Sequence, residues 1–121
     1  MITGTTPLGL RTDDLVIPQG TTWEVRWPIL KDDGTPADLG GWQVRAQVRR
    51  TRRSAAVLHE WSTTLGNAAI SNATISLRVA ANESSAWDWS TAAFDVEIYS
   101  LDGRVVRVTQ GTLHVDPEVT R

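Results

Sequence analysis

The sequence predicts an all-β protein, an antiparallel sandwich of about seven short strands with a single helical turn near residues 82–89. Apolar side chains recur at every second position in several segments, which is the pattern of strands that bury one face. Clusters of glycine, proline, asparagine and aspartate interrupt these segments roughly every 8–12 residues. A length of 121 residues fits one domain, which we place at residues 14–121.

The first 30 residues are expected to contain an arm and two strands. Residues 1–13 hold glycine and proline without a sustained period, so we expect a flexible arm there. A short strand follows near residues 15–17, and a longer one covers residues 23–29, where every second residue from Trp23 is apolar. Pro28 cannot donate a backbone hydrogen bond, so we expect this part of the strand at a sheet edge or a bulge.

The middle of the chain predicts three further strands and the helical turn. Residues 42–48 alternate apolar and polar side chains, and a less regular strand is expected near residues 57–61. The alternation resumes at residues 74–79. Residues 82–89 lack alternation and carry serine, asparagine, aspartate and glutamate at positions that suit helix caps. We therefore expect one helical turn there that packs one of its two tryptophans.

The last two strands form a hairpin whose register follows from the apolar residues. Directly opposed residues share one face of a sheet. A three-residue loop pairs Ile98 with Val106 and Val96 with Val108, whereas a two-residue loop separates these apolar residues. Beyond Val108 the apolar residues change from even to odd positions, which predicts a bulge at residues 110–111. The complete pattern is that of an immunoglobulin-like sandwich.

The composition excludes several kinds of protein. The chain has no cysteine, so disulfides, thiolate nucleophiles and cysteine zinc sites are ruled out. No apolar stretch approaches the roughly 18 residues of a membrane-spanning helix, and we expect no signal peptide and no membrane contact. The formal net charge of -2 points to neither a polyanionic partner nor an acidic tail.

Residue types that support catalysis are scarce. His59 and His114 are the two histidines, and each lies within an expected strand. Asp32, Asp33 and Asp38 surround a glycine, but their spacing does not match a calcium-binding loop. We expect solvated turn carboxylates at these positions, and a protein without enzymatic activity, metal or cofactor.

A basic cluster is the sharpest local feature of the sequence. The chain is acidic overall and no aromatic residue lies between the arginines, so nucleic acid would find no stacking surface there. An acidic protein neighbour or solvent suits the cluster better. The cluster consists of Arg45, Arg49, Arg50, Arg52 and Arg53.

Six tryptophans in a chain of this length are unusual. Those at apolar positions of the early strands are expected in the core, because an indole ring buries a large apolar area. Trp87 and Trp89 flank Asp88 in the expected helical turn, where they suit either a contact with a partner or a sugar-stacking site. Trp61 fits neither group clearly. The tryptophans expected in the core are Trp23, Trp27 and Trp42.

Three segments carry a resemblance to a known family. They are residues 17–22, which read IPQGTT, residues 31–42, which read KDDGTPADLGGW, and residues 111–120, which read GTLHVDPEVT. The series resembles small β-sandwich structural proteins of tailed bacteriophages and prophages, and is similar to the N-terminal domain family of siphophage baseplate upper proteins. Thr21 stands where that family often has aspartate, and Gly40 where threonine is usual.

The resemblance implies a non-enzymatic virion protein, made in a bacterial cytoplasm and placed in the tail, the baseplate or the head–tail joint. Its partners would be other virion proteins and further copies of itself, and the family supplies no catalytic residues. Two alternatives stay open, a capsid decoration protein and a glycan-binding module for host adhesion. The residues expected to make contacts are Leu8, Leu10, Arg11, Arg49, Arg50, Arg52, Arg53, Trp87 and Trp89.

Overall fold

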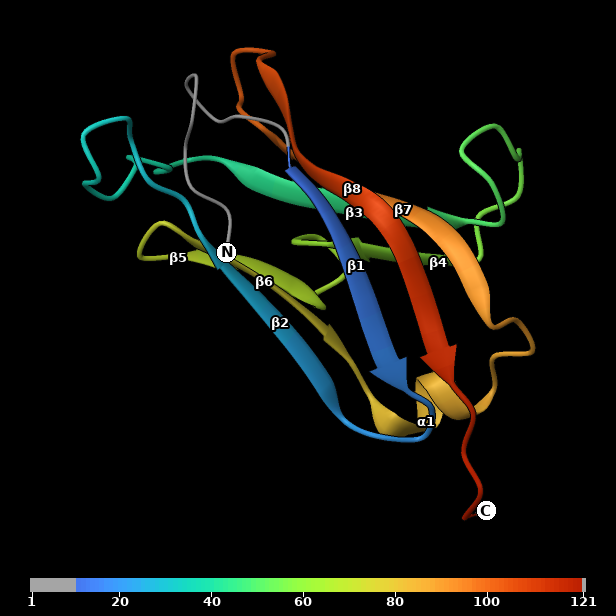
Figure 1. Cartoon of the computed structure of the whole chain (residues 1–121). Helices are drawn as coiled ribbons and strands as arrows, with labels where there is room; N and C mark the ends of the chain where they lie inside the picture. Colours follow the sequence, from blue (N-terminus) through green and yellow to red (C-terminus); the bar gives the residue numbers. More distant parts are fainter. Residues whose placement is uncertain (1–10, 121) are drawn as a thin grey trace.

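The computed structural model describes residues 11–120 and confirms an all-β sandwich. This part of the chain forms eight strands, one more than expected, and one short helix (Figure 1). The strands are β1 (Arg11–Pro18), β2 (Trp23–Pro28), β3 (Gln43–Arg49), β4 (His59–Ser62), β5 (Ala68–Ser71), β6 (Thr74–Val79), β7 (Thr91–Tyr99) and β8 (Val105–Asp116), and the helix is α1 (Ala81–Ser85).

Two sheets pack against each other. The larger sheet has the strand order β1-β8-β7-β3-β4, and the smaller sheet has the order β2-β6-β5. All neighbouring strands are antiparallel except β1, which runs parallel to β8. The smaller sheet matches the B-E-D strands of an immunoglobulin-like sandwich, and β8-β7-β3-β4 matches its G-F-C-C′ strands. The immunoglobulin-like arrangement is therefore present, with β1 added beside β8.

The core lies between the two sheets and is built from alternate residues of their strands. Trp61 is fully buried at its centre, and its indole N–H donates a hydrogen bond to the carbonyl oxygen of Arg78 at 2.9 Å. Trp27 is also buried, as expected. Trp23 and Trp42 are only half-buried and pack against the margin of the core. A buried indole thus keeps its polar atom satisfied while it fills the space between the sheets.

The expected arm at residues 1–13 lies mostly outside the described residues. Its last three residues belong to β1, so the prediction that they are irregular is wrong. In β1, Arg11 pairs with Thr109 and Asp13 with Gly111 of β8. The sequence predicted a strand only near residues 15–17 and gave no sign that it begins at Arg11, because a parallel partner near the other end of the chain supplies the hydrogen bonds there. Leu8 and Leu10 fall outside the described part of the chain.

Pro28 lies at a sheet edge, as expected. Strand β2 is the outermost strand of the smaller sheet, and Pro28 forms its last pair, opposite Thr74 of β6. The missing backbone N–H therefore interrupts no hydrogen bond within the sheet.

Strand β5 was not expected from the sequence. It forms a hairpin with β6 through a two-residue turn at Asn72 and Ala73, which have φ angles of 52° and 58°. Positive φ at both central residues defines a type I′ turn, which matches the twist of the flanking strands. Alanine rarely occupies such a position, so the sequence carried no recognisable turn signal here.

The hairpin of β7 and β8 has the expected three-residue loop. The Ser100 N–H donates to the carbonyl oxygen of Arg104 at 3.0 Å, so the loop comprises the three residues between them. Gly103 has a φ of 91°, the left-handed conformation that glycine adopts most easily. The expected pair of Ile98 with Val106 is present.

The bulge in β8 comes earlier than expected. Val96 pairs with Thr109 rather than with Val108, because the register shifts by one residue between Val96 and the next residue of β7. Val108 and Thr109 are consequently both buried, although they are neighbours in sequence. The predicted bulge at residues 110–111 is therefore wrong in position. The change that it explained is confirmed, because the residues of β8 that face the core change from even-numbered to odd-numbered positions.

Helix α1 confirms the expected helical turn and closes one end of the sandwich (Figure 1). Its Ser84 hydroxyl accepts a hydrogen bond from the N–H of Gly20 at 2.8 Å, which ties the β1–β2 turn to the helix. The Gln19 amide donates to the carbonyl oxygen of Trp87 at 3.1 Å and strengthens this connection. Within residues 11–120, no helix is long and apolar enough to cross a membrane.

Candidate interaction surfaces

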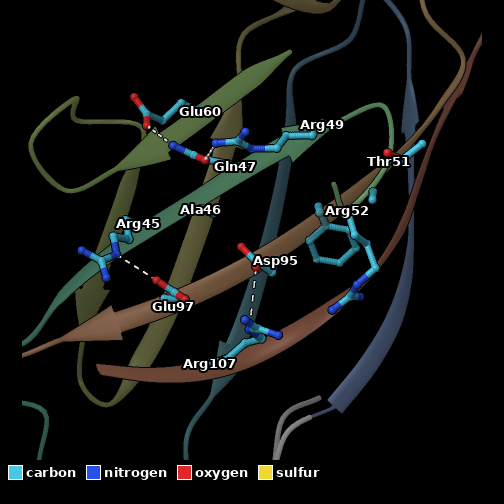
Figure 2. A pocket seen from close by; sticks show the side chains of 12 residues that line it. Arg45, Ala46, Gln47, Arg49, Thr51, Arg52, Glu60, Asp95, Glu97 and Arg107 are labelled. Carbon is cyan, nitrogen blue, oxygen red and sulfur yellow. Dashed lines mark hydrogen bonds and ion pairs between the residues drawn. The ribbon is translucent and has the colours of Figure 1, made fainter. Parts of the chain in front are cut away.

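The outer face of the larger sheet carries a hollow of about 480 Å³ (Figure 2). Odd-numbered residues of β3 and β7 point toward it, because their even-numbered neighbours fill the core. Ala93 is small among long neighbours, which helps to open the hollow. The lining residues are Arg45, Ala46, Gln47, Arg49, Thr51, Arg52, Glu60, Ala93, Phe94, Asp95, Glu97 and Arg107.

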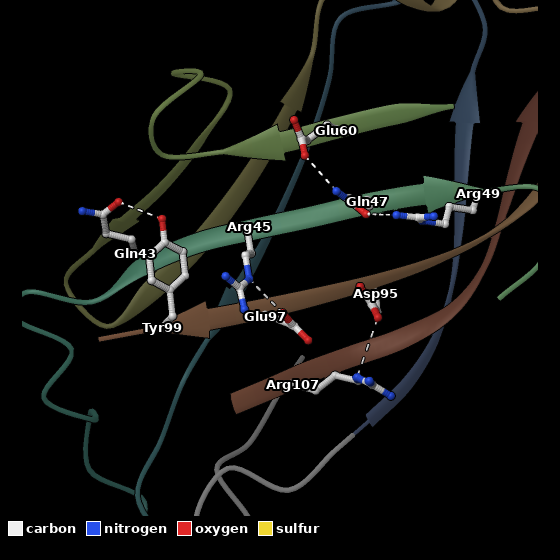
Figure 3. A network of polar contacts seen from close by, with 9 residues as sticks. All are labelled: Gln43, Arg45, Gln47, Arg49, Glu60, Asp95, Glu97, Tyr99 and Arg107. Carbon is white, nitrogen blue, oxygen red and sulfur yellow. Dashed lines mark hydrogen bonds and ion pairs between the residues drawn. The ribbon is translucent and has the colours of Figure 1, made fainter. Parts of the chain in front are cut away.

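Polar side chains on this face pair with one another across the strands (Figure 3). Arg45 lies directly opposite Glu97, and its Nε is 2.9 Å from the carboxylate. Gln47 donates to Glu60 on the neighbouring strand at 2.9 Å. Opposed partners of this kind stabilise a sheet modestly. The face is therefore charged, but most of its charges are already matched within the molecule.

Asp95 is the most perturbed carboxyl group of the hollow. Burial raises the pKa of Asp95 above its usual range, and the nearby carboxylate of Glu97 adds to this rise. The guanidinium of Arg107, with its Nε 3.7 Å from the carboxylate, acts in the opposite direction. Burial disfavours the charged form of an acid, so the ionised form of Asp95 depends on the nearby arginines, which lower its pKa.

Arg49 stabilises the loop between β3 and β4 through hydrogen bonds to its backbone. One of its guanidinium nitrogens donates to the carbonyl oxygens of Ser54 and Ala55, both at 2.8 Å, and the other donates to Gln47 at 2.8 Å. These bonds hold residues 50–58, which connect β3 and β4. The expectation that Arg49 contacts a partner is not supported by this arrangement, because its hydrogen-bonding groups are engaged.

The remaining arginines of the cluster divide into two kinds. Arg52 lines the hollow (Figure 2) and donates a hydrogen bond to Gln110 of β8 at 2.6 Å. Arg50 and Arg53 are exposed and form no ion pair with any residue in the range 11–120. Only these two arginines of the expected contact set remain available. Arg11, at the start of β1, is half-buried and paired with Asp13 at 3.1 Å.

The two tryptophans after α1 do not form an exposed pair. Trp89 is 7% exposed and belongs to the core, so little of its ring is left to contact a partner. Trp87 is half-buried and stacks on Trp89 with 4.7 Å between ring centroids. The sequence did not separate these alternatives, because burial depends on how the loop packs onto β4.

His59 lies in an aromatic cluster within β4. Its ring meets Trp61 edge-on at 4.6 Å and Trp87 at 5.1 Å. Its Nε2 is buried and has no hydrogen-bond partner among the described residues. Burial lowers the pKa of His59, while the carboxylates of Glu83 and Glu60 oppose this effect. His59 is therefore neutral near pH 7 and packs as an aromatic side chain.

The loop between β2 and β3 bounds a second hollow, of about 530 Å³, at the end of the sandwich. We call this hollow the acidic groove and define it by residues 30–42 together with Arg104. The Asp33 carboxylate accepts a hydrogen bond from the N–H of Thr35 at 2.9 Å, and Asp38 accepts one from Gly40 at 3.2 Å. The expectation of turn carboxylates is confirmed at both positions.

The acidic groove was not foreseen, because it depends on residues that are far apart in sequence. The guanidinium of Arg104, in the β7–β8 loop, lies 5.1 Å from the centroid of the Trp42 ring. This contact closes one side of the groove with a cation–π interaction. Among residues 11–120, no group of three histidine, cysteine, aspartate or glutamate residues is placed to hold a metal ion.

No protein-family model matches this sequence, and no curated protein matches it significantly. Two polar features stand out on the described surface. One is a sheet face whose charges are matched internally, and the other is a pair of end loops of opposite charge.

Proposed function

We propose that this chain is a non-enzymatic structural protein of a tailed-bacteriophage particle, located in the tail, the baseplate or the head–tail joint. It works by assembly, as a rigid sandwich that docks against neighbouring virion proteins and further copies of itself. The observation that carries the proposal is where the family-like segments lie in the fold. Residues 17–22 cover the end of β1 and the turn to β2. Residues 31–42 lie between β2 and β3 and are called the acidic loop. Residues 111–120 cover the end of β8 and the four residues after it.

The polar groups of the sandwich support a role in contacts rather than in chemistry. The three carboxylates that line the hollow of the larger sheet face arginine or glutamine side chains on adjacent strands. His59 is half-buried, and its ring contacts the indole rings of Trp61 and Trp87. A side chain held in this way contributes packing, whereas a general base needs reach to a substrate proton.

A glycan-binding module is the main alternative from another class, and the tryptophans argue against it. Sugar stacking needs an open indole face. All six tryptophans of the chain are buried or half-buried, and Arg104 already covers the ring of Trp42. Capsid decoration remains an alternative position in the same particle and uses the same kind of contact.

The particle itself provides the test. The coding sequence is deleted from the phage or prophage genome that carries it, and purified particles are examined by mass spectrometry and negative-stain electron microscopy. We expect the chain in wild-type particles, and incomplete or unstable tails after deletion that are restored when the wild-type chain is supplied in trans. Complete particles after deletion, together with absence of the chain from wild-type particles, would contradict the proposal.

A further inference from the structure

We infer that copies of this chain associate head to tail, with the basic loop of one copy docked in the acidic groove of the next. The basic loop is defined as residues 50–58, between β3 and β4. This inference rests on the proposed assembly function and names one of its partners, a second copy of the chain.

The two surfaces lie at opposite ends of one strand. The acidic loop immediately precedes β3 and the basic loop immediately follows it. The two loops therefore lie at opposite ends of the larger sheet (Figure 1). A contact between unlike surfaces is heterologous, and each copy then presents one surface of each kind. Such contacts continue from copy to copy until the arrangement closes or a different protein ends it.

The basic loop carries unmatched positive charge. Arg50, Arg52 and Arg53 lie in it, and residues 50–58 include no aspartate or glutamate. Arg50 and Arg53 are exposed and form no ion pair within the described part of the chain. Arginine is suited to this role because its planar guanidinium binds a carboxylate through two hydrogen bonds.

The basic loop is also held in one shape before it meets a partner. The Arg49 guanidinium donates hydrogen bonds to the carbonyl oxygens of Ser54 and Ala55. The N–H of Thr51 donates to the Ser54 hydroxyl at 3.1 Å, and the Ser54 N–H donates to the carbonyl oxygen of Thr51 at 3.2 Å. A loop that is already ordered loses little conformational entropy when it docks.

The acidic groove offers the matching charge. Asp32, Asp33 and Asp38 line it, against the positive charges of Lys31 and Arg104. Arg104 is itself paired with an aspartate of its own loop at 3.2 Å, so the groove and its margin are negative overall. Hydrogen bonds from Thr35 lower the pKa of Asp33, which keeps this carboxylate ionised.

The two surfaces also match in their apolar parts. Leu30, Leu39 and Trp42 line the groove beside its carboxylates. The basic loop carries exposed alanines and Val57, which is 43% exposed. A docked loop therefore brings arginines to the carboxylates and small apolar side chains to the apolar lining.

A symmetric pairing of two sheet faces explains the same charges less well. Arg45, Glu97 and their neighbours on that face already bind one another within the chain. Docking two such faces would break or bury these pairs, and burying charges is costly unless every one finds a new partner.

Charge reversal provides the test, with sedimentation velocity of the full chain as the measurement. Wild-type protein should sediment faster as its concentration rises at about 20 mM salt, and should revert to a monomer near 0.5 M salt, where charges are screened. The variant R50E/R53E and the variant D32K/D38K should each associate at least about tenfold more weakly than wild type at low salt. Circular dichroism and thermal unfolding establish that both variants are folded.

Mixing the two variants gives the decisive result. The unchanged basic loop of D32K/D38K fits the unchanged groove of R50E/R53E, and the two reversed surfaces fit each other. An equimolar mixture should therefore recover the association that neither variant shows alone. The single reversal R53E should also weaken association. Its control is R26E, because Arg26 lies on β2, outside the residues that define either surface, and R26E should associate like wild type.

Several outcomes would overturn the inference. The inference would be refuted if the wild-type protein stayed monomeric at low salt. It would also be refuted if the mixture of the two variants failed to recover association. Association that persists in both reversed variants would point instead to the sheet face or to residues 1–10. None of these results bears on whether the chain is present in phage particles, so the proposed function is tested separately.

Discussion

Gly111 marks the place where β1 passes tightly against β8. A Cβ atom at this position would lie 1.7 Å from the carbonyl oxygen of Asp13, a distance that no side chain tolerates. The obstacle is backbone, so β1 itself would have to move. The glycine is therefore needed for the parallel pairing of the two strands.

Replacing Gly111 with alanine should lower the free energy of unfolding by about 1–3 kcal/mol or more, as expected for overpacking against a fixed backbone. Urea unfolding followed by tryptophan fluorescence measures the change. The matched control is Gly40→Ala. A Cβ atom at position 40 would lie 3.4 Å from its nearest neighbour, a side-chain oxygen of Asp38, and this is an ordinary contact distance. Equal stabilities for the two variants would contradict the close approach of β1 to β8.

His59 links the stability of the fold to pH. Its pKa in the folded state lies below its ordinary value of 6.5, so the unfolded chain binds a proton more readily. The free energy of unfolding should therefore be fully maintained above about pH 6.5 and should fall as the pH drops through the folded pKa. Lowering the pH charges a ring that is packed between Trp61 and Trp87.

The variant His59→Phe should flatten this pH dependence between about pH 7 and 5, because phenylalanine keeps the aromatic contacts and cannot titrate. Its stability at pH 7 should be close to wild type, since the Nε2 atom that it removes has no partner in the described structure. Chemical unfolding at several pH values measures both effects. His114 is exposed in β8 and serves as the control. If His114→Gln altered the pH dependence of stability as much as His59→Phe does, the dependence could not be assigned to His59.

At the scale of single elements, the sequence predicted strands wherever side chains alternate. Apolar and polar residues alternate clearly along β3 and β6, and the predicted ends of both strands lie within a residue or two of the observed ends. Strand β5 was missed, because Ala68 and Ala69 give no contrast between its faces and its turn uses an alanine at positive φ. The parity change in β8 revealed that a bulge exists, but only its pairing with Val96 locates it.

The turn between β5 and β6 can be improved. Ala73 has a φ of 58°, a conformation that costs a residue with a Cβ atom about 1–2 kcal/mol and costs glycine little. The variant Ala73→Gly should raise the free energy of unfolding by about 0.5–1 kcal/mol, once the greater freedom of glycine in the unfolded chain is allowed for.

The control for this turn is Ala69→Gly, on the exposed face of β5. It makes the same chemical change in an extended strand, where glycine weakens the structure. Urea unfolding should thus show opposite signs for the two variants. A loss of stability in both would mean that the left-handed turn is not strained.

At the scale of the whole molecule, the sequence identified the charged segments but not their roles. It singled out the arginines at residues 45–53, yet it did not reveal that Arg49 and Arg52 are occupied within the chain. It treated the acidic loop as a solvated turn, because the groove forms only when Trp42 meets Arg104. These contacts join residues that are distant in sequence, so only the fold brings them together.

Cysteine cross-linking shows directly which surfaces of two copies meet, because the chain itself contains no cysteine. The variants Arg53→Cys and Asp38→Cys are mixed at low salt with oxidised glutathione as the two-electron oxidant, and formation of a disulfide between them is followed by mass spectrometry. Head-to-tail docking predicts that the mixed disulfide forms several-fold faster than the disulfide of either variant with itself. A rate no higher than that of Asp38→Cys mixed with Arg26→Cys would contradict the account.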